Sequence, residues 1–264
     1  MVTAIFIVGT GRSGTHFATR TLRGFSNIWD PHDGKEYPEI LYPIAKAAIR
    51  HKSFPHIARG YYLAKSREGA GRVLLDQHHP NLFFIPDLLG IYPDAVFLYP
   101  RRPIEQIVAS MMRHQGILNW YDYAKAWRPF RRVPMPNQFL GIDRRAQIDG
   151  LPLALLCAYR VIAHLRKLEA MMARFSQVRV LSYENLVRDQ QAEIRRVFRD
   201  SELDLMGDLR LQEQPRRNSL SKYQDVLSAE EIELVRQMEA EFDRHAPHCR
   251  PAPAPAAATE LTTA

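Results

Sequence analysis

A glycine-rich loop follows a short apolar run close to the first residue of the sequence. The run Ala4–Val8 consists of apolar residues and leads into the stretch GTGRSGTH, which begins at Gly9 and contains Gly14. A short apolar run that ends at glycine is typical of a buried parallel strand. Residues 14–23 continue in a helical pattern. Because loop amides and a helix N-terminus both attract anions, this order of elements predicts an anion-binding site.

Apolar runs and helical patterns alternate along the rest of the sequence. Further strands are predicted at residues 72–76, 95–99 and 178–182. Helices are predicted at residues 40–51, 103–114, 151–175, 183–200 and 227–242, the last with a capping box from Ser228 to Glu231. This alternation predicts a three-layer α/β/α fold with a central parallel sheet. Ligands on such sheets bind beyond the carboxyl ends of the strands.

The length and the local composition predict one domain. The chain has 264 residues, 46% of them hydrophobic, which is enough for one buried core over residues 1–245. Residues 116–150 are irregular, aromatic and rich in Arg, so we expect an insert or lid that binds the acceptor. A helical insert that buries its own rings is the alternative. Residues 246–264 are rich in Pro and Ala, and we expect a disordered tail.

Composition also limits the choice of cellular compartment and of binding partners. The sequence has no apolar run of membrane-spanning length, and its two cysteines, Cys157 and Cys249, lie far apart. Such sparse cysteines fit the reducing cytoplasm. The net charge of +7 favours anionic partners such as nucleotides. No nucleic-acid-binding motif is present, so a nucleic-acid partner is not expected, and the oligomeric state stays open.

The glycine loop departs from the common nucleotide-binding loop. The pattern GxxxxGK[ST] is matched only by Gly9 and Gly14, because Thr15 and His16 replace the Lys and the metal-binding hydroxyl. This difference argues against chemistry that needs a metal to bridge phosphates. Arg12 supplies a positive charge within the loop instead. A nucleotide or small-molecule kinase with a divergent loop remains the alternative.

The same stretch resembles the 5′-phosphosulfate loop of bacterial and Golgi-type sulfotransferases that use 3′-phosphoadenosine 5′-phosphosulfate (PAPS). This resemblance implies the P-loop NTPase-like sulfotransferase fold and PAPS as the cofactor, with PAP as its product. It also implies that the loop binds the donor, through Gly11, Arg12, Ser13, Gly14, Thr15 and His16. Arg12 is expected to take part in catalysis as well. His16 stands where most members have a small hydroxyl residue.

Two later stretches resemble the parts of the family that hold the 3′-phosphate. In FLYPRRPIEQIVASMMRH, an Arg at a strand end and a Ser on the next helix converge on one phosphate. Ser110 stands eight residues after Arg102 (110 − 102), but the Arg-x-Pro pattern selects Arg101, so both arginines are candidates. A C-terminal segment that closes over the nucleotide is implied for Arg216, Arg217 and Ser219, with a solvated basic loop as the alternative.

By this resemblance, the chain moves a sulfonate from PAPS to a hydroxyl or amine of a small-molecule, carbohydrate or lipid acceptor. The transfer is expected to be in line and free of metal, with a Glu or His as general base. Glu36 resembles the base of bacterial and Golgi-type members, and His79 resembles the base of cytosolic ones. We prefer Glu36 on the resemblance. Contacts with the acceptor are expected from Lys35, His78, Trp120 and Tyr123.

Overall fold

The structure is a computed structural model of the chain. It describes residues 3–69, 71–118, 133–199, 203, 205 and 220–249. Five residues with an expected role therefore lie outside the described residues: Trp120, Tyr123, Arg216, Arg217 and Ser219.

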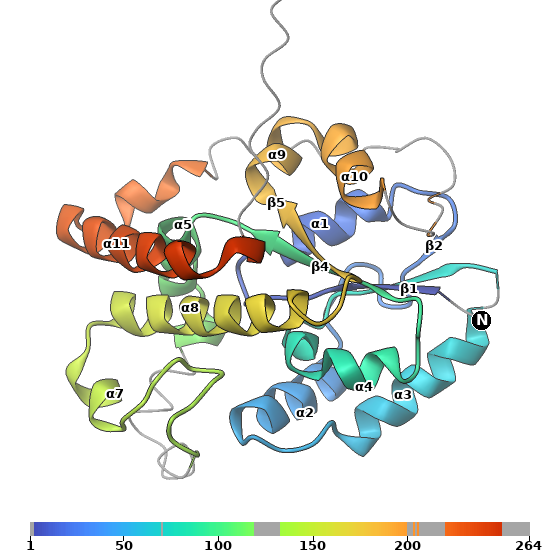
Figure 1. The fold of residues 1–264 in the computed structure, drawn as a ribbon, viewed down its shortest axis with the longest axis horizontal. Coiled ribbons are helices and arrows are strands. Elements are labelled where there is room, and N and C mark those ends of the chain that lie inside the picture. Colours follow the sequence, from blue (N-terminus) through green and yellow to red (C-terminus); the bar gives the residue numbers. More distant parts are fainter. Residues whose placement is uncertain are drawn as a thin grey trace, which may run out of the picture.

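A parallel sheet forms the centre of the described chain, with strands in the order β2-β3-β1-β4-β5 (Figure 1). The strands are β1 Thr3–Ile7, β2 Ile28–Trp29, β3 Val73–Asp76, β4 Val96–Arg101 and β5 Val178–Ser182. Four of these strands confirm the sequence prediction. The two-residue strand β2 was not predicted, because it is too short to show a hydrophobic period.

Helices cover both faces of the sheet, so the predicted three-layer α/β/α fold is confirmed (Figure 1). Ile5 and Ile7 of β1 point to the smaller core, under α1 Thr15–Leu22, α9 Tyr183–Arg188 and α10 Gln190–Phe198. Ala4 and Phe6 point to the larger core. The helices of that layer are α2 Pro38–Ile49, α3 His56–Glu68, α4 Ile85–Leu89, α5 Ile104–Met112, α8 Leu153–Met172 and α11 Ala229–His245.

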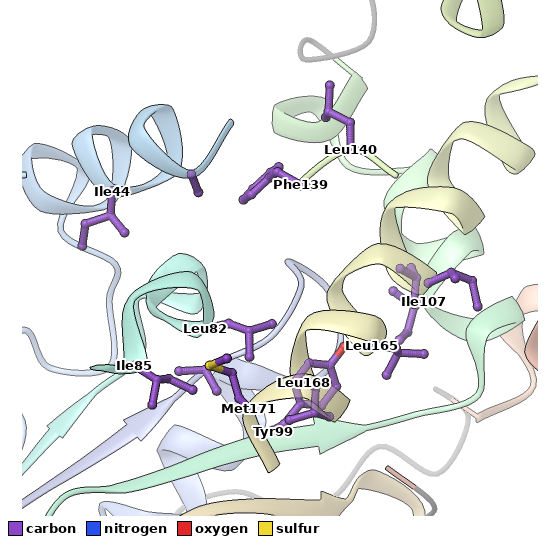
Figure 2. Packing of buried hydrophobic residues seen from close by; sticks show 14 of the residues in the cluster. Ile44, Leu82, Ile85, Tyr99, Ile107, Phe139, Leu140, Leu165, Leu168 and Met171 are labelled. Carbon is purple, nitrogen blue, oxygen red and sulfur yellow. The ribbon is translucent and has the colours of Figure 1, made fainter. Parts of the chain in front are cut away.

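The long helix α8 packs its apolar face over strand β4. Figure 2 shows Leu165, Leu168 and Met171 of this helix beside Tyr99 of the strand. Phe139, from the described part of the segment 116–150, is fully buried in the same core. The described part of that segment therefore contributes to the core, as well as lying near the site described below.

Two sequence expectations about the chain's C-terminal third are wrong. The helix expected at 183–200 is two helices, because Asp189 breaks it and its side chain accepts a hydrogen bond from the N–H of Ala192 at 2.9 Å. The disordered tail was also expected to start at residue 246, which is too early in the sequence. Pro247–Cys249 form a 3₁₀ turn, and Ala246 and Cys249 are buried against α8 and α11. Within the described ranges, the structure has no helix both long and apolar enough to cross a membrane.

Candidate active site

The glycine loop begins where β1 ends, at the carboxyl edge of the sheet. The N–H of Gly9 donates to the backbone oxygen of His79 at 3.1 Å, which ties the loop to the segment after β3. The hydroxyl of Ser13 donates to the backbone oxygen of Thr10 at 2.9 Å and closes the turn. Gly14 has a φ of 109°, and a Cβ on it would overlap the ring of Tyr183. Only glycine therefore fits there.

Arg12 joins two cavities at this edge. Its own φ is 77°, in the left-handed region, and its Nε donates to the Oγ of Ser110 on α5 at 3.1 Å. One side of Arg12 faces a cavity that we call the basic cavity, lined in part by Arg102, Ser110, Arg113, Lys222 and Tyr223. The other side faces a second cavity, which we call the dyad cavity after the residue pair Glu36 and His79. It is lined in part by His16, Glu36, His79, Ile117, Phe139 and Arg160.

The structure separates the two candidate arginines at the end of β4. Arg101 is 4% exposed, and its guanidinium contacts Glu239 at 2.7 Å and donates to Asp243 at 3.1 Å, both on α11. Arg102 lies with its guanidinium 4.6 Å from the ring centre of Tyr183 and lines the basic cavity beside Ser110. The structure therefore brings Arg102, and not Arg101, into the cavity that Ser110 lines, while Arg101 pairs with carboxylates of α11.

The basic cavity contains residues that the sequence reasoning missed. Arg113 follows Ser110 by three residues and caps the C-terminal end of α5, and this spacing of one helical turn was an available signal. Lys222 and Tyr223 come from the 3₁₀ turn Lys222–Asp225, and the Nη2 of Arg236 donates to the Tyr223 hydroxyl at 2.9 Å. Four cationic side chains and no carboxylate are found among the described residues that line this cavity. Such a cavity attracts a polyanion.

Glu36 and His79 meet in the dyad cavity. The Nδ1 of His79 lies 3.0 Å from Oε1 of Glu36. Burial alone would raise the pKa of the Glu36 carboxyl, but the hydrogen bond and the charge of His79 outweigh it and lower the pKa to about 2. Because the carboxylate only accepts, Nδ1 of His79 carries the proton and Nε2 is the basic nitrogen. A Cβ on Gly11 would lie 3.8 Å from Nε2, so this nitrogen faces the glycine loop.

A tight turn before α2 presents Glu36. The carboxylate of Asp30 accepts hydrogen bonds from the N–H groups of His32, at 3.0 Å, and Gly34, at 2.6 Å. Gly34 has a φ of 74°, which favours glycine. Lys35 lies in the same turn, but its side chain is exposed and does not line the dyad cavity. The structure therefore brings Glu36 into the cavity and leaves Lys35 outside it.

His78, expected to contact the acceptor, is buried beside the site and does not line the dyad cavity. The side chain is 1% exposed, with its Nδ1 2.7 Å from Asp76. The N–H of Tyr37 donates to its Nε2 at 3.1 Å. Asp76 in turn accepts from Tyr62 and Asn81, at 3.2 and 3.1 Å. Through the N–H of Tyr37, this buried network holds the backbone next to Glu36 in place.

Two further histidines line the dyad cavity. Burial, followed by the positive field of Arg12 and its neighbours, lowers the pKa of His16, although Glu36 opposes this shift. Burial also lowers the pKa of His114, which lines both cavities. Both imidazoles are therefore neutral near pH 7. His16, in the first turn of α1, lies beside Arg12 and His79 in the cavity wall.

No protein-family model and no curated protein matches the sequence. Solved structures match it in fold. The chain is similar to a sulfotransferase from Alicyclobacillus acidocaldarius with a TM-score of 0.54 and 16% identity, over 93% of this chain and 96% of that one. It is similar to the sulfotransferase domain from the curacin biosynthetic pathway with a TM-score of 0.54 and 9% identity, over 91% and 98%. For the sulfotransferase domain of the Synechococcus PCC 7002 olefin synthase, the values are 0.53 and 11%, over 90% and 94%.

These matches cover nearly the whole length of each solved structure, so the similarity extends beyond the glycine loop. At such low identity they show a shared fold. The P-loop-like sulfotransferase fold that the sequence resemblance implied is therefore confirmed.

Proposed function

We propose that the chain transfers a sulfonate group from PAPS to a hydroxyl or amine of a small-molecule, carbohydrate or lipid acceptor. One observation carries the proposal. Arg12 stands between a cavity lined by cations and a cavity that holds a histidine–carboxylate dyad. A donor with phosphates at both ends of its ribose needs the first cavity, and an acceptor that must lose a proton needs the second.

The residues present fit PAPS. The loop amides and Arg12 supply positive charge for a 5′-phosphosulfate. Arg102 and Ser110 lie together for a 3′-phosphate, with Lys222 on the opposite element. When bound, PAPS supplies an activated sulfonate. Ser13 and Thr15 are buried in the loop and add hydroxyl groups on the same side of the sheet.

His79 is the general base in this proposal. Its Nε2 faces the loop and takes the proton of the acceptor, while Glu36 holds Nδ1–H and stabilises the imidazolium that forms. The family resemblance favoured Glu36 as the base, whereas the geometry supports His79. A carboxyl with a pKa of about 2 is a weak base, which agrees with an orienting role for Glu36.

The kinase alternative is less well supported. A kinase loop uses its Lys on the phosphates and its hydroxyl on the metal, and Thr15 and His16 occupy those positions here. The sulfotransferase proposal needs neither group, because Arg12 supplies the charge.

A screen with labelled PAPS tests the proposal. The parent protein is expected to transfer label to at least one hydroxyl-bearing acceptor. Arg12→Ala is expected to bind PAP roughly tenfold to a hundredfold more weakly, because it removes a charge-assisted contact. Transfer from ATP·Mg²⁺ and none from PAPS, across the same acceptors, would contradict the proposal.

A further inference from the structure

The buried imidazole of His78 joins two segments that lie far apart in the sequence. His78 follows β3, and its Nε2 accepts a hydrogen bond at 3.1 Å from the N–H of Tyr37, the residue before α2. Glu36 and His79 neighbour these two residues in the sequence and make the contact of 3.0 Å in the dyad cavity. Two adjacent contacts therefore hold the turn before α2 against the end of β3.

The hydrogen bonds of His78 fix which of its nitrogens carries the proton. Nδ1 lies 2.7 Å from Oδ2 of Asp76, and a carboxylate only accepts, so Nδ1 carries the proton. Burial opposes a charged ring, but Asp76 raises the pKa of His78 above its ordinary value. A second proton would have to sit on Nε2, where the N–H of Tyr37 already points. The observed contacts therefore need the neutral ring.

The end of β3 also reaches the glycine loop. The backbone oxygen of His79 accepts from the N–H of Gly9 at 3.1 Å, so the loop holds one partner of the dyad. Hydrogen bonds to Asp30 shape the turn that carries the other partner, and Tyr37 joins that turn to His78. Loss of this join would free the turn to move its carboxylate away from the imidazole of the base.

We propose that His78 is a positioning residue for the base: its neutral Nε2 holds the N–H of Tyr37 and so keeps the Glu36 carboxylate on His79. This inference rests on the proposed function for its effect on turnover, whereas its effect on the contact between Glu36 and His79 belongs to the fold. It goes beyond that function, because the proposed transfer assigns roles to the dyad alone.

Two substitutions of His78 separate its two hydrogen bonds. His78→Gln places an amide oxygen near the position of Nε2 and can accept from Tyr37, whereas His78→Asn reaches only the position of Nδ1. With PAPS and an acceptor from the screen, His78→Asn is expected to lower kcat roughly tenfold to a hundredfold, and His78→Gln to stay within about threefold of the parent. PAP affinity is expected to be unchanged in both. His56→Asn is the matched control, because this histidine is exposed on α3 and lines neither cavity.

Asp76→Asn tests the same contact with the imidazole in place. Oδ1 of Asp76 accepts from the N–H of His78 and from Asn81, so an amide puts its oxygen there and its NH₂ towards Nδ1 of His78. The ring then carries its proton on Nε2 and cannot accept from Tyr37, so we expect the same loss of kcat. Urea unfolding reports whether each variant is folded. A folded His78→Asn or Asp76→Asn protein with the kcat of the parent would overturn the inference.

A stability measurement tests the inference without turnover. In the parent, Glu36→Gln is expected to lower the urea midpoint at pH 7, because it removes the carboxylate from His79. In the His78→Asn background, the same change is expected to shift the midpoint by less than about half as much, and in the His78→Gln background by nearly as much as in the parent. Equal shifts in all three backgrounds would contradict the inference.

The two proposals fail in different ways. If PAP does not bind and no acceptor receives label, the proposed function fails, and the midpoint shifts still decide whether His78 positions Glu36. If label passes at the same rate in the parent and in folded His78→Asn, the sulfonate transfer stands and the positioning role of His78 fails.

Discussion

At the level of single residues, His79 and Glu36 differ in what each can reach. The imidazole has one nitrogen on the carboxylate and the other towards the glycine loop, whereas the carboxylate of Glu36 is occupied by the imidazole. The arrangement is that of a histidine base, His79, whose ring is oriented by a carboxylate, Glu36. Sequence reasoning identified both residues, but the order of their roles depends on side-chain geometry that no spacing reveals.

Substitution of the two residues separates their roles. His79→Ala is expected to lower kcat by roughly 10²–10⁴-fold, and Glu36→Gln by less, while PAP affinity stays unchanged in both. Steady-state kinetics with labelled PAPS and PAP titration measure the two effects. Lys35→Ala is the control, since its side chain is exposed outside the cavity. If Glu36→Gln were inactive and His79→Ala retained turnover, Glu36 would be the base.

Gly14 is a second residue whose role can be tested alone. Its φ of 109° and the adjacent Tyr183 ring leave no place for a Cβ. Gly14→Ala is expected to lower the free energy of unfolding by roughly 2–4 kcal/mol and to weaken PAP binding, as urea unfolding and calorimetry would show. Gly60→Ala is the matched control, because a Cβ there meets open space on α3. A Gly14→Ala protein as stable as the parent would contradict the proposed loop geometry.

At the level of elements, two neighbouring arginines at the end of β4 make different contacts. Arg101 forms ion pairs with Glu239 and Asp243 of α11, whereas Arg102 lines the basic cavity. The Arg-x-Pro pattern and the eight-residue spacing pointed to different residues. The carboxylates that pair with Arg101 lie more than 130 positions later in the chain, beyond the reach of local patterns.

The two arginines are therefore expected to respond oppositely. Arg101→Gln removes the guanidinium that contacts Glu239 and Asp243 and is expected to cost about 3 kcal/mol of unfolding free energy, with little effect on PAP affinity once folded. Arg102→Gln is expected to cost less than about 1 kcal/mol and to weaken PAP binding roughly tenfold or more. Urea unfolding measures the stability of both variants, and PAP titration measures their affinity for PAP. Equal losses of PAP affinity in the two variants would contradict the expected contrast.

Regular elements with a clear hydrophobic period were predictable, and interruptions were less so. The strands after residues 72, 95 and 178 and the capping box at Ser228 follow from local sequence. Asp189 splits a helix whose apolar period continues on both sides of it, so the period alone gives no break. Cys249 is buried through contact with α8, and a Pro/Ala-rich composition does not reveal such a contact.

At the level of the whole molecule, the dyad also links the site to stability. The pKa of Glu36 in the folded protein is about 2, below its ordinary value of 4.5, so the group stabilises the fold above pH 4.5. This contribution is lost as the pH falls through 2. Because the side chain is 27% exposed and screened by solvent, we expect roughly 1–2 kcal/mol at pH 7.

Urea unfolding of the parent and of Glu36→Gln across this pH range tests the linkage. The parent is expected to be the more stable protein at pH 7, and the difference is expected to shrink towards zero near pH 2. A difference that stays constant with pH would mean that the Glu36 carboxyl is not stabilised by His79 in the folded state.

The central claim is that the two cavities joined by Arg12 take a PAPS-type donor and an acceptor. The most direct test is calorimetric titration of the protein with PAP and, separately, with ATP·Mg²⁺. We expect PAP to bind about tenfold more tightly than ATP·Mg²⁺ or better, because its 3′-phosphate meets Arg102 and Ser110 and ATP has no such group. Tighter binding of ATP·Mg²⁺, with no measurable binding of PAP, would contradict the account.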